Sequence, residues 1–479
     1  MNPILSARMA RRTKLLLCAL ATTALAACGV GQDGTGATPD TQATGVITGF
    51  GSVIVDGVHY DVSAAAISTD GSTGRSQADL RAGMVVTVTG TLAADGSSGT
   101  ASQLAYESLL RGAIDEAPGL SALRVLGQRI AVDSTTVFDG VANLSDLRTA
   151  DALEVSGFTD PAGGFRATWI CKESSASAPQ LTGFISQVNG SVVGLAGLNV
   201  NLTNATLVGV TLNTLATGQR VRVQLQAPPS AGAAVATRLV LLGSGLDGAL
   251  RRQAIQGLVN QWNSVNQTFL LDGQRVRLDA ATQFQDGSLT DIGNGARVRV
   301  LGTRGSDGTL TAERVLIYRP AIDGYVRGRV TAIDRAALRF TVQVASGVQV
   351  QLRATTLLSD LSLANNLTPA NLTVGDEVLA LGWLSGTRLD AGLVQRLPLI
   401  ATGVGIGGPV SSFNAGTGAL TVLGVTVGTN SAGAQFFDAQ GVPQNQAQFF
   451  AALAANDLVR ADGALVGNGL VANTVRRVP

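Results

Sequence analysis

The chain has 479 residues, of which 45% are hydrophobic, 14% are charged and 59 are glycine. Its 34 basic and 33 acidic residues nearly cancel, which gives a formal net charge of +1 at neutral pH. This composition excludes an intrinsically disordered chain and a coiled coil, because both need a larger charged fraction. We therefore expect a β-rich globular protein.

Residues 1–27 have the composition of a secretory signal peptide. Basic residues between positions 8 and 14 precede a continuous apolar stretch that starts at Leu15. Every later apolar run is interrupted after a few residues, so the sequence predicts no transmembrane helix. We expect this segment to be removed on export.

The signal peptide ends in Leu25-Ala26-Ala27-Cys28, which resembles the lipobox of bacterial lipoproteins. The resemblance implies that Cys28 carries diacylglycerol and palmitate and becomes the first mature residue, and an ordinary signal peptide with a chance cysteine is the alternative. Gly29 in place of aspartate implies, by similarity to proteobacterial lipoproteins, an outer-membrane location on the periplasmic face or the cell surface. The lipid bilayer is thus the expected partner of acylated Cys28. Residues 28–44 are small and polar, which is typical of a flexible tether.

Once Cys28 is acylated, Cys171 is the only free thiol of the mature chain, so no intramolecular disulfide is expected. Cys171 lies in the alternating segment RATWICKE. This pattern predicts a buried position in a strand, and an intermolecular disulfide is the alternative.

Three sequence anchors recur six times in the same order, which predicts six copies of one module. The first anchor is a glycine at a strand start, and its copies lie 67 to 75 residues apart at Gly45, Gly112, Gly183, Gly257, Gly328 and Gly403. The second is an eleven-residue segment such as LRAGMVVTVTG from Leu80. The third is an alanine that leads an apolar strand, at Ala101, Ala167, Ala236, Ala312, Ala391 and Ala472. The predicted modules are 45–108, 109–173, 180–243, 253–318, 325–397 and 400–478.

Each module is predicted to contain five strands. Alternating segments on both sides of Asp56-Gly57 and Asp272-Gly273 predict hairpins, because Asp-Gly tolerates the positive φ angles of a tight turn. A longer connection with a helical turn then leads to two further strands. This order resembles an OB-like barrel. The main alternative is a β-propeller, whose repeat of roughly 40 to 50 residues is too short.

The segment GFG at Gly49–Gly51 could be read as a phosphate-binding loop. Such a loop needs a helix directly after it, so that backbone amides face the anion. Here a strand and a hairpin turn follow. We therefore interpret the two glycines as a bend or bulge of the first strand.

The segments GFGSVIVDGVHYD and DLRAGMVVTVTG resemble a domain of unknown function that occurs in tandem in proteobacterial lipoproteins and secreted proteins. The first module matches this pattern best, and the fourth follows closely. The fifth and sixth modules depart from it by insertions between their third and fourth strands. The resemblance implies a fold and a location, and it carries no catalytic residue and no cofactor.

The sequence predicts no enzyme. The single histidine, His59, lies in an alternating strand, where a half-exposed position is expected. Most aspartates lie in turns, where the turn geometry already explains their presence without a catalytic role. One histidine and one available cysteine do not suffice for a zinc site, so no metal is expected.

Two functions stay open. In the first, the array is an envelope scaffold or interaction protein. In the second, it binds an anionic polysaccharide or nucleic acid through OB-like faces, with the fourth module as the best candidate. Arg275 and Arg277, and also Arg297 and Arg299, stand two apart in predicted strands, so each pair projects to one side of the sheet. A solvated strand face would explain the same spacing. No small-molecule substrate is inferred. Three tryptophans, Trp169, Trp262 and Trp383, are expected in barrel cores.

Overall fold

The fold was analysed in a computed structural model, which describes residues 41–478 except for 94–95, 120, 142, 176, 244–249, 251, 319–322, 346, 362–366, 399–402 and 468. The signal segment, Cys28 and most of the expected tether lie outside the described residues. Strand β1 begins at Thr41, so the last four residues of the stretch 28–44 belong to a strand.

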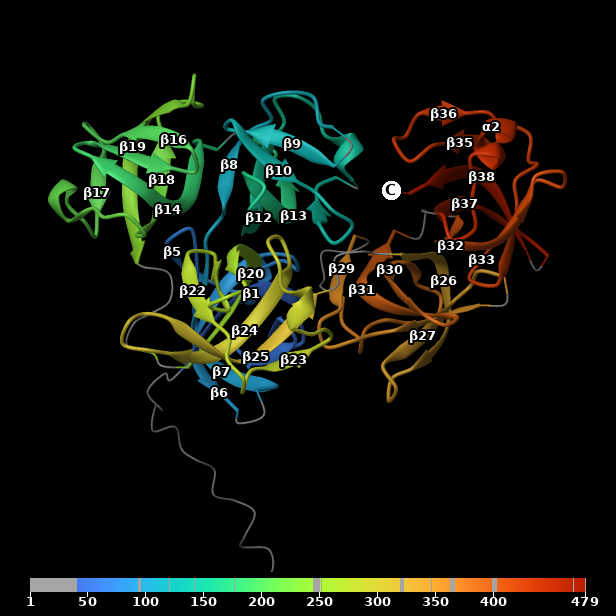
Figure 1. Ribbon diagram of the computed structural model, residues 1–479, viewed down its shortest axis with the longest axis horizontal. Helices are drawn as coiled ribbons and strands as arrows, with labels where there is room; N and C mark the ends of the chain where they lie inside the picture. Colours follow the sequence, from blue (N-terminus) through green and yellow to red (C-terminus); the bar gives the residue numbers. More distant parts are fainter. Residues whose placement is uncertain are drawn as a thin grey trace, which may run out of the picture. The chain divides into compact units, whose positions relative to one another are not determined.

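The described chain forms six small β-barrels, which are coloured in chain order in Figure 1. Barrel 1 consists of β1 (Thr41–Gly49), β2 (Val53–Val55), β3 (Val58–Asp61), β4 (Ala66–Thr69), β5 (Ser72–Arg75), β6 (Val85–Leu92) and β7 (Ser98–Tyr106). Barrel 2 consists of β8 (Leu110–Ala113), β9 (Ala122–Val125), β10 (Gln128–Ala131), β11 (Val137–Asp139), β12 (Ala152–Thr159) and β13 (Phe165–Lys172). Barrel 3 consists of β14 (Gln180–Asn189), β15 (Val192–Leu195), β16 (Leu198–Asn201), β17 (Thr206–Val208), β18 (Arg220–Leu225) and β19 (Ala233–Gly243).

The second half of the chain repeats this plan. Barrel 4 consists of β20 (Arg252–Asn263), β21 (Thr268–Leu271), β22 (Gln274–Arg277), β23 (Gln283–Gln285), β24 (Arg297–Arg304) and β25 (Leu310–Tyr318). Barrel 5 consists of β26 (Gly324–Asp334), β27 (Arg339–Val342), β28 (Val348–Gln351), β29 (Leu357–Asp360), β30 (Glu377–Ser385) and β31 (Arg388–Leu397). Barrel 6 consists of β32 (Val404–Asn414), β33 (Ala419–Val422), β34 (Val425–Gly428), β35 (Gln435–Phe437), β36 (Pro443–Gln444), helix α2 (Gln446–Ala451), β37 (Leu458–Val466) and β38 (Gly469–Arg477).

Barrel 4 shows how five of these strands close. Strand β20 pairs with β21, β21 with β22, β22 in parallel with β25, β25 with β24, and β24 with β20 again. This is the order of an OB-like barrel, in which the third and fifth strands run parallel. The predicted all-β fold with five-stranded OB-like modules is therefore confirmed.

Barrels 1 and 6 have seven strands, because they also contain β5 and β36. Every barrel has one short strand, before its last two long strands, that the sequence does not predict. These strands, β4, β11, β17, β23, β29 and β35, each pair in parallel with the last strand of their own barrel. The predicted helical turn follows the short strand in the first four barrels as a 3₁₀ helix, at Gln77–Asp79, Leu144–Asp146, Leu212–Thr214 and Leu289–Asp291.

The turn predictions are confirmed by the backbone angles. Asp56 and Gly57 have φ of 52° and 79°, and Asp272 and Gly273 have φ of 43° and 80°. Strand β1 ends at Gly49 after a shift of register between Ile47 and Gly49, and a turn leads directly into β2. The GFG segment is thus a bend between strands, as predicted.

One predicted repeat anchor, Gly403 of the sixth module, is wrong. Gly408 occupies the position of Gly328, because both have φ of 159° and both precede a bulge toward the following strand. Gly403 lies just before the first residue of β32. The excess of glycine around residues 403–408 hid the correct alignment.

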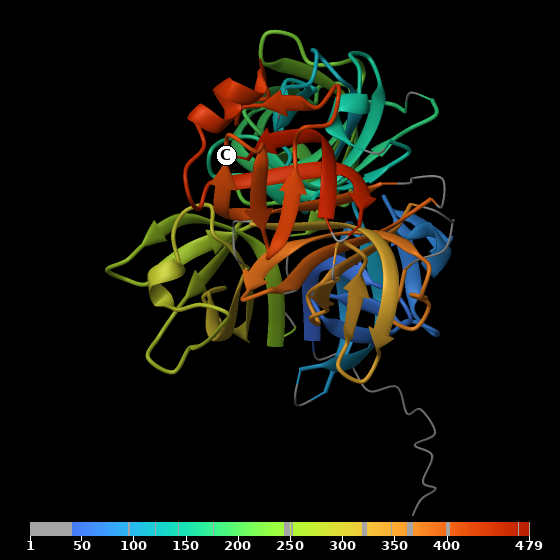
Figure 2. The same cartoon turned by 90° about the vertical axis from the view of Figure 1, so that its right-hand side faces the viewer.

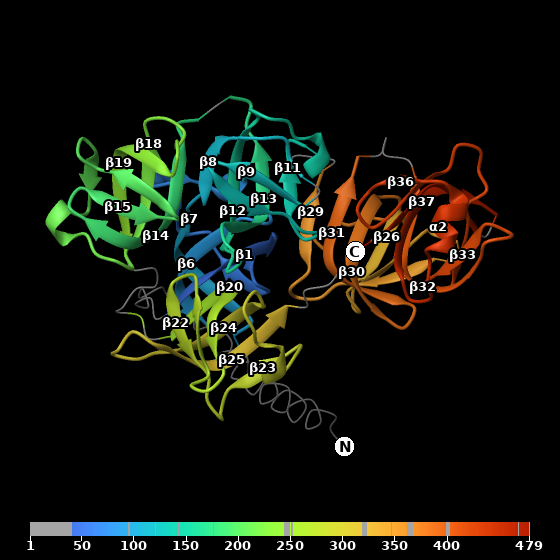
Figure 3. The same cartoon turned by 45° about the horizontal axis from the view of Figure 1, so that its top comes forward.

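The barrels are joined in pairs by shared sheets. The start of β1 pairs in parallel with β20, so barrels 1 and 4 share one 13-stranded sheet, in which these two strands lie side by side (Figure 1). Strand β8 pairs with β14 and joins barrels 2 and 3 (Figure 3). Strand β26 pairs with β32 and joins barrels 5 and 6, drawn in orange and red in Figure 2. The modules are therefore not six separate domains in series.

The hydrophobic cores follow the same pairing in part. Barrels 2 and 3 share one core, and so do barrels 5 and 6. Barrel 4 has a core of its own. The core of barrel 1 extends into residues of three other barrels, namely Val137, Phe158 and Trp169 of barrel 2, Ala254, Leu258 and Leu301 of barrel 4, and Leu357 and Leu393 of barrel 5. Barrel 1 therefore shares buried surface with three of the five other barrels.

Candidate functional site

The first arginine pair lies where the sequence predicts it. Arg275 and Arg277 are exposed on β22, and they alternate with Gln274 and Val276, which are buried. Arg277 donates a hydrogen bond from Nη2 to Thr311 Oγ1 at 3.2 Å. This pair forms a small basic surface on the outside of barrel 4.

The second pair lies in a different environment. The Arg299 side chain is only 13% exposed, and its Nε is 3.9 Å from Asp56 Oδ2 of barrel 1. The Arg297 guanidinium lies over the ring of Tyr318, 4.9 Å from its centroid, and 5.6 Å from that of Phe158 in barrel 2. The structure therefore does not bring the four arginines together on one open face.

Asp56 is the centre of the junction between barrels 1 and 4. It is 4% exposed, and Tyr318 donates a hydrogen bond from its hydroxyl to Asp56 Oδ1 at 2.8 Å. The carboxylate fits because residue 45 is glycine: a Cβ there would lie 2.3 Å from Asp56 Oδ2. Burial raises the pKa of Asp56 to about 6, although Arg299, Tyr318 and Arg297 all act to lower it.

A second link between these barrels is a hydrogen bond of 2.9 Å from the Val46 amide to Gln256 Oε1, which is buried. The sequence predicts only a turn at Asp56 and gives no signal for Gln256. Neither residue has a local pattern that distinguishes it, since Asp272 stands in an equivalent Asp-Gly turn.

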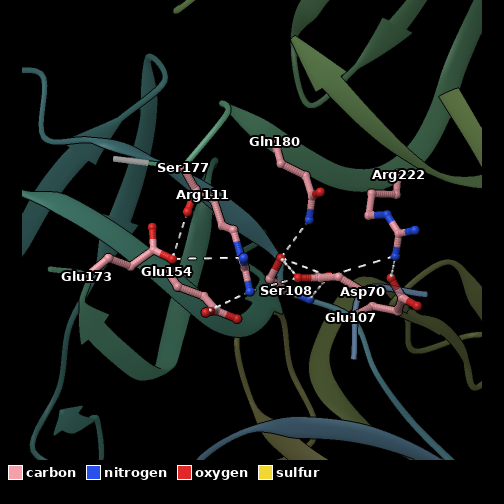
Figure 4. A network of polar contacts seen from close by, with 9 residues as sticks. All are labelled: Asp70, Glu107, Ser108, Arg111, Glu154, Glu173, Ser177, Gln180 and Arg222. Carbon is pink, nitrogen blue, oxygen red and sulfur yellow. Dashed lines mark hydrogen bonds and ion pairs between the residues drawn. The ribbon is translucent and has the colours of Figure 1, made fainter. Parts of the chain in front are cut away.

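A larger charged network joins barrels 1, 2 and 3 (Figure 4). Arg111 of β8 lies at its centre, with Nη2 2.8 Å from Glu154 Oε2 and 3.0 Å from Asp70 Oδ2. Asp70 also accepts hydrogen bonds from the backbone amide of Ser108 at 2.9 Å and from its hydroxyl at 3.0 Å. Arg111 Nη1 is 3.9 Å from Glu173, which closes the network on the side of barrel 2.

Barrel 3 enters the network through two residues. Arg222 of β18 forms an ion pair with Glu107 and lies 3.8 Å from Asp70 Oδ1. Gln180 of β14 donates a hydrogen bond from Nε2 to Ser108 Oγ at 2.8 Å (Figure 4). The segment Glu107–Ser108 that connects barrels 1 and 2 is therefore held by barrel 3 as well.

Burial sets the electrostatics of this network. It raises the pKa of Glu107 and of Glu154, and the neighbouring guanidinium groups of Arg222 and Arg111 oppose that rise. Burial alone would lower the pKa of Arg111, but Glu154 and Asp70 raise it overall. A buried charge that loses its partner destabilises the fold strongly, so these pairs favour the arrangement of the barrels in which every charge is paired.

The remaining sequence candidates occupy structural positions. His59 is exposed on β3, with Nδ1 3.3 Å from Ser52 Oγ. Cys171 is half-buried and unpaired, and burial raises the pKa of its thiol to about 12. Of the three tryptophans expected in barrel cores, only Trp169 is fully buried, edge-on against Tyr106 with ring centroids 6.4 Å apart. Trp262, which packs against Phe269, and Trp383 are half-buried.

Among the residues that the structure describes, no group of three or more histidine, cysteine, aspartate or glutamate side chains could hold a metal ion. None of the helices in the same part of the chain is both long and apolar enough to cross a membrane.

Comparison with known proteins gives one match. A search of curated proteins found none that matches the chain. A family model described as a domain of unknown function matches six times, at residues 44–104, 111–170, 182–239, 256–315, 327–391 and 407–476. The sixth match starts at 407, one residue before Gly408, just as the others start one residue before their anchor glycine. Because these matches cover most of the chain, it belongs to the family of this domain of unknown function (DUF5666), which it carries in six tandem copies.

Proposed function

We propose that this protein is a non-catalytic envelope scaffold or interaction protein, held at the outer membrane by a lipid on Cys28. The observation that carries the proposal is that buried and half-buried polar groups join one barrel to another. Asp56, Arg111 and Arg222 all form contacts between barrels. Such contacts favour a rigid assembly that presents the outer barrel surfaces in a defined arrangement.

The lipid anchor is supported by the lipobox-like Leu25-Ala26-Ala27-Cys28. Replacing Cys28→Ala is expected to abolish labelling by an alkyne analogue of palmitate, because the acylated thiol is then missing. The protein should leave the outer-membrane fraction or stall as a precursor. Cys171→Ala is the matched control, since it removes the other mature cysteine. Labelling that persists in Cys28→Ala, or disappears in Cys171→Ala, contradicts the anchor.

The scaffold is tested in a deletion strain whose envelope is challenged with detergent. We expect wild-type protein and the double variant Arg275→Gln/Arg277→Gln to restore resistance equally, and Cys28→Ala to fail. A scaffold depends on the anchor and on the joined barrels, whereas a polymer binder depends on its exposed cations. Failure of the double arginine variant would favour the second function.

Binding of an anionic polysaccharide or nucleic acid is the second candidate. It is favoured by the exposed pair Arg275 and Arg277 on β22. The full chain should then be retained on heparin, and its affinity for single-stranded nucleic acid should fall with salt. Replacing both arginines with glutamine should reduce the salt slope by about 1.4, since each neutralised phosphate contributes about 0.7. Arg124→Gln in barrel 2 is the control, because Arg124 is exposed and already paired with Glu116 at 3.0 Å.

A further inference from the structure

A cavity of about 100 Å³ lies where barrels 1, 2, 4 and 5 meet. Thr48 of β1, Thr135 after β10, Arg297 of β24 and Thr355 before β29 each contribute to its wall. Its volume is somewhat smaller than the roughly 150 Å³ of an engineered apolar cavity that binds benzene. A molecule about the size of a six-membered ring would therefore occupy most of it.

Arg297 is the distinctive group of this wall. Its guanidinium lies over the rings of Tyr318 and Phe158, and its Nε is buried without a hydrogen-bond partner. A guanidinium has five N–H donors, and buried donors nearly always find an acceptor. Arg297 also lines the cavity, so an acceptor bound there would supply the partner that Nε lacks.

The two carboxylates of the wall have cations of their own. Asp133 Oδ2 is 3.9 Å from Arg166 Nη1, and Asp286 Oδ1 is 3.6 Å from Arg353 Nη1. Asp133 Oδ1 also accepts the backbone amide of Thr135 at 2.8 Å. Asp56, across the junction, accepts a hydrogen bond from Tyr318 and lies 3.9 Å from Arg299, and the charge of Arg297 acts on it more weakly than that of Arg299. Arg297 is therefore the charged group of the wall that can pair with a ligand.

Apolar side chains make up much of the remaining wall, including Val46, Leu258, Leu316, Leu357 and the ring of Trp383. Leu258 and Leu357 are both nearly inaccessible to solvent. We propose that this cavity binds a small monocarboxylate with an apolar body, whose carboxylate pairs with Arg297 and whose body lies against Leu258, Leu357 and Trp383. A planar guanidinium matches a carboxylate, and the apolar wall favours a ring or short hydrocarbon chain over a hydrated ion.

The proposal is tested by calorimetric titration of the full chain with benzoate, benzyl alcohol and inorganic phosphate. Benzoate should bind with one site per chain. Benzyl alcohol should bind at least about tenfold more weakly, because it lacks the charge-assisted hydrogen bonds. Phosphate should also be at least about tenfold weaker, because it has no apolar body to bury. Phosphate binding as strong as that of benzoate would overturn the apolar half of the proposal.

Three variants locate the site. Arg297→Gln should weaken benzoate binding about tenfold or more. Thr355→Tyr should abolish it by filling the cavity from barrel 5 while leaving the guanidinium in place. Arg275→Gln, on the outside of barrel 4, should bind like the wild type. Thermal melting without ligand checks that each variant is folded. No benzoate binding to wild type at millimolar concentration, or unchanged binding in both Arg297→Gln and Thr355→Tyr, would overturn the proposal.

Discussion

At the scale of single residues, Asp56 both forms a turn of barrel 1 and contacts barrel 4. Asp56-Gly57 predicts a tight turn, and the turn is present. The same side chain also accepts a hydrogen bond from Tyr318, a residue 262 positions away. No local pattern encodes that contact, because it depends on how two barrels pack. For the same reason the alternation of Arg297 and Arg299 correctly predicts a shared side of the strand but not that barrel 1 covers it.

Asp56 should make stability depend on pH. Its pKa is about 6 in the folded protein, above the ordinary value of 3.8, so the folded state binds this proton more tightly than the unfolded state. The resulting stabilisation is fully present below about pH 4 and is lost as the pH rises through 6. Two pKa units correspond to about 3 kcal/mol.

We therefore expect the unfolding free energy of wild type minus that of Asp56→Asn to fall by about 2 kcal/mol between pH 4 and pH 7. Asparagine keeps the shape of the side chain and does not titrate, so the difference removes the contribution of all other carboxylates. Hydrogen exchange of β1 and β2 peptides in urea reports this junction. A difference that is constant with pH contradicts the raised pKa.

Arg111 allows a test of the network between barrels 1, 2 and 3. Its side chain is 26% exposed and contacts both Asp70 and Glu154. Arg111→Met should lower the unfolding free energy by about 3 kcal/mol, because it leaves buried carboxylates without a cation. Arg124→Met in the same barrel is the matched control, since Arg124 is half exposed and its pair with Glu116 should be worth less than about 1 kcal/mol. Equal effects of the two variants in thermal melting would show that burial adds nothing at Arg111.

At the scale of strands, the repeated sequence anchors correspond to one backbone feature. In five barrels the glycine at the end of the second anchor lies opposite the alanine of the third anchor, next to a bulge: Gly90 and Ala101, Gly157 and Ala167, Gly302 and Ala312, Gly382 and Ala391, Gly463 and Ala472. A Cβ on each of these glycines would lie 2.0 to 2.1 Å from a carbonyl oxygen of the facing strand. In barrel 3 the position is occupied by Leu225, which faces Ala236.

A matched pair of glycines in barrel 4 tests this interpretation. A Cβ at Gly302 would lie 2.1 Å from the Thr311 oxygen, whereas a Cβ at Gly293 would meet nothing within 4 Å. Gly302→Ala should destabilise barrel 4 by about 1 to 3 kcal/mol, because the strands must move apart. Gly293→Ala should change the unfolding free energy by less than about 0.5 kcal/mol. Hydrogen exchange of β24 and β25 peptides measures both, and a neutral Gly302→Ala would mean that the bulge relaxes freely.

The short strands that pair in parallel with the last strand of each barrel could not be predicted from the sequence, for a physical reason. Strand β23 has three residues, and it pairs in parallel with β25, about thirty residues further along. Three residues are too few to show alternation, and no turn signal marks a parallel pair. The hairpins, by contrast, were predictable because the turn and both strands are adjacent in the chain.

At the scale of the whole molecule, the number of modules is visible in the sequence but their pairing is not. Barrels 1 and 4 are joined by four residues of each strand, which are Thr41–Thr44 and 252–255. These residues have the same strand-like sequence as many other segments, so nothing in the sequence marks them as partners. Adjacent barrels 2 and 3 pair directly, as do 5 and 6. Barrel 1 instead pairs with a barrel that follows two others in the chain.

This pairing predicts the outcome of cutting the chain between barrels 3 and 4. A protease site inserted at residues 244–249 should yield two fragments that stay together in size-exclusion chromatography, because β1 and β20 share a sheet and barrel 1 packs on residues of barrels 4 and 5. A site inserted instead at 399–402 serves as the comparison, since β26 and β32 also share a sheet across that cut. Fragments that separate after the first cut under native conditions would show that the barrels are independent domains.

The pairing of β1 with β20 also has a consequence for the order in which the sheet is completed during folding. As the chain emerges from its N-terminus, barrel 1 can close while residues Thr41–Thr44 still present unpaired backbone groups on one side. Those groups gain their partner only when residues 252–255 arrive, which follow barrels 2 and 3 in the chain. During this interval β1 is an open sheet edge, which is the kind of surface that starts misassembly between chains. Only four residues are uncovered, so the exposed template is too short to hold a foreign strand firmly.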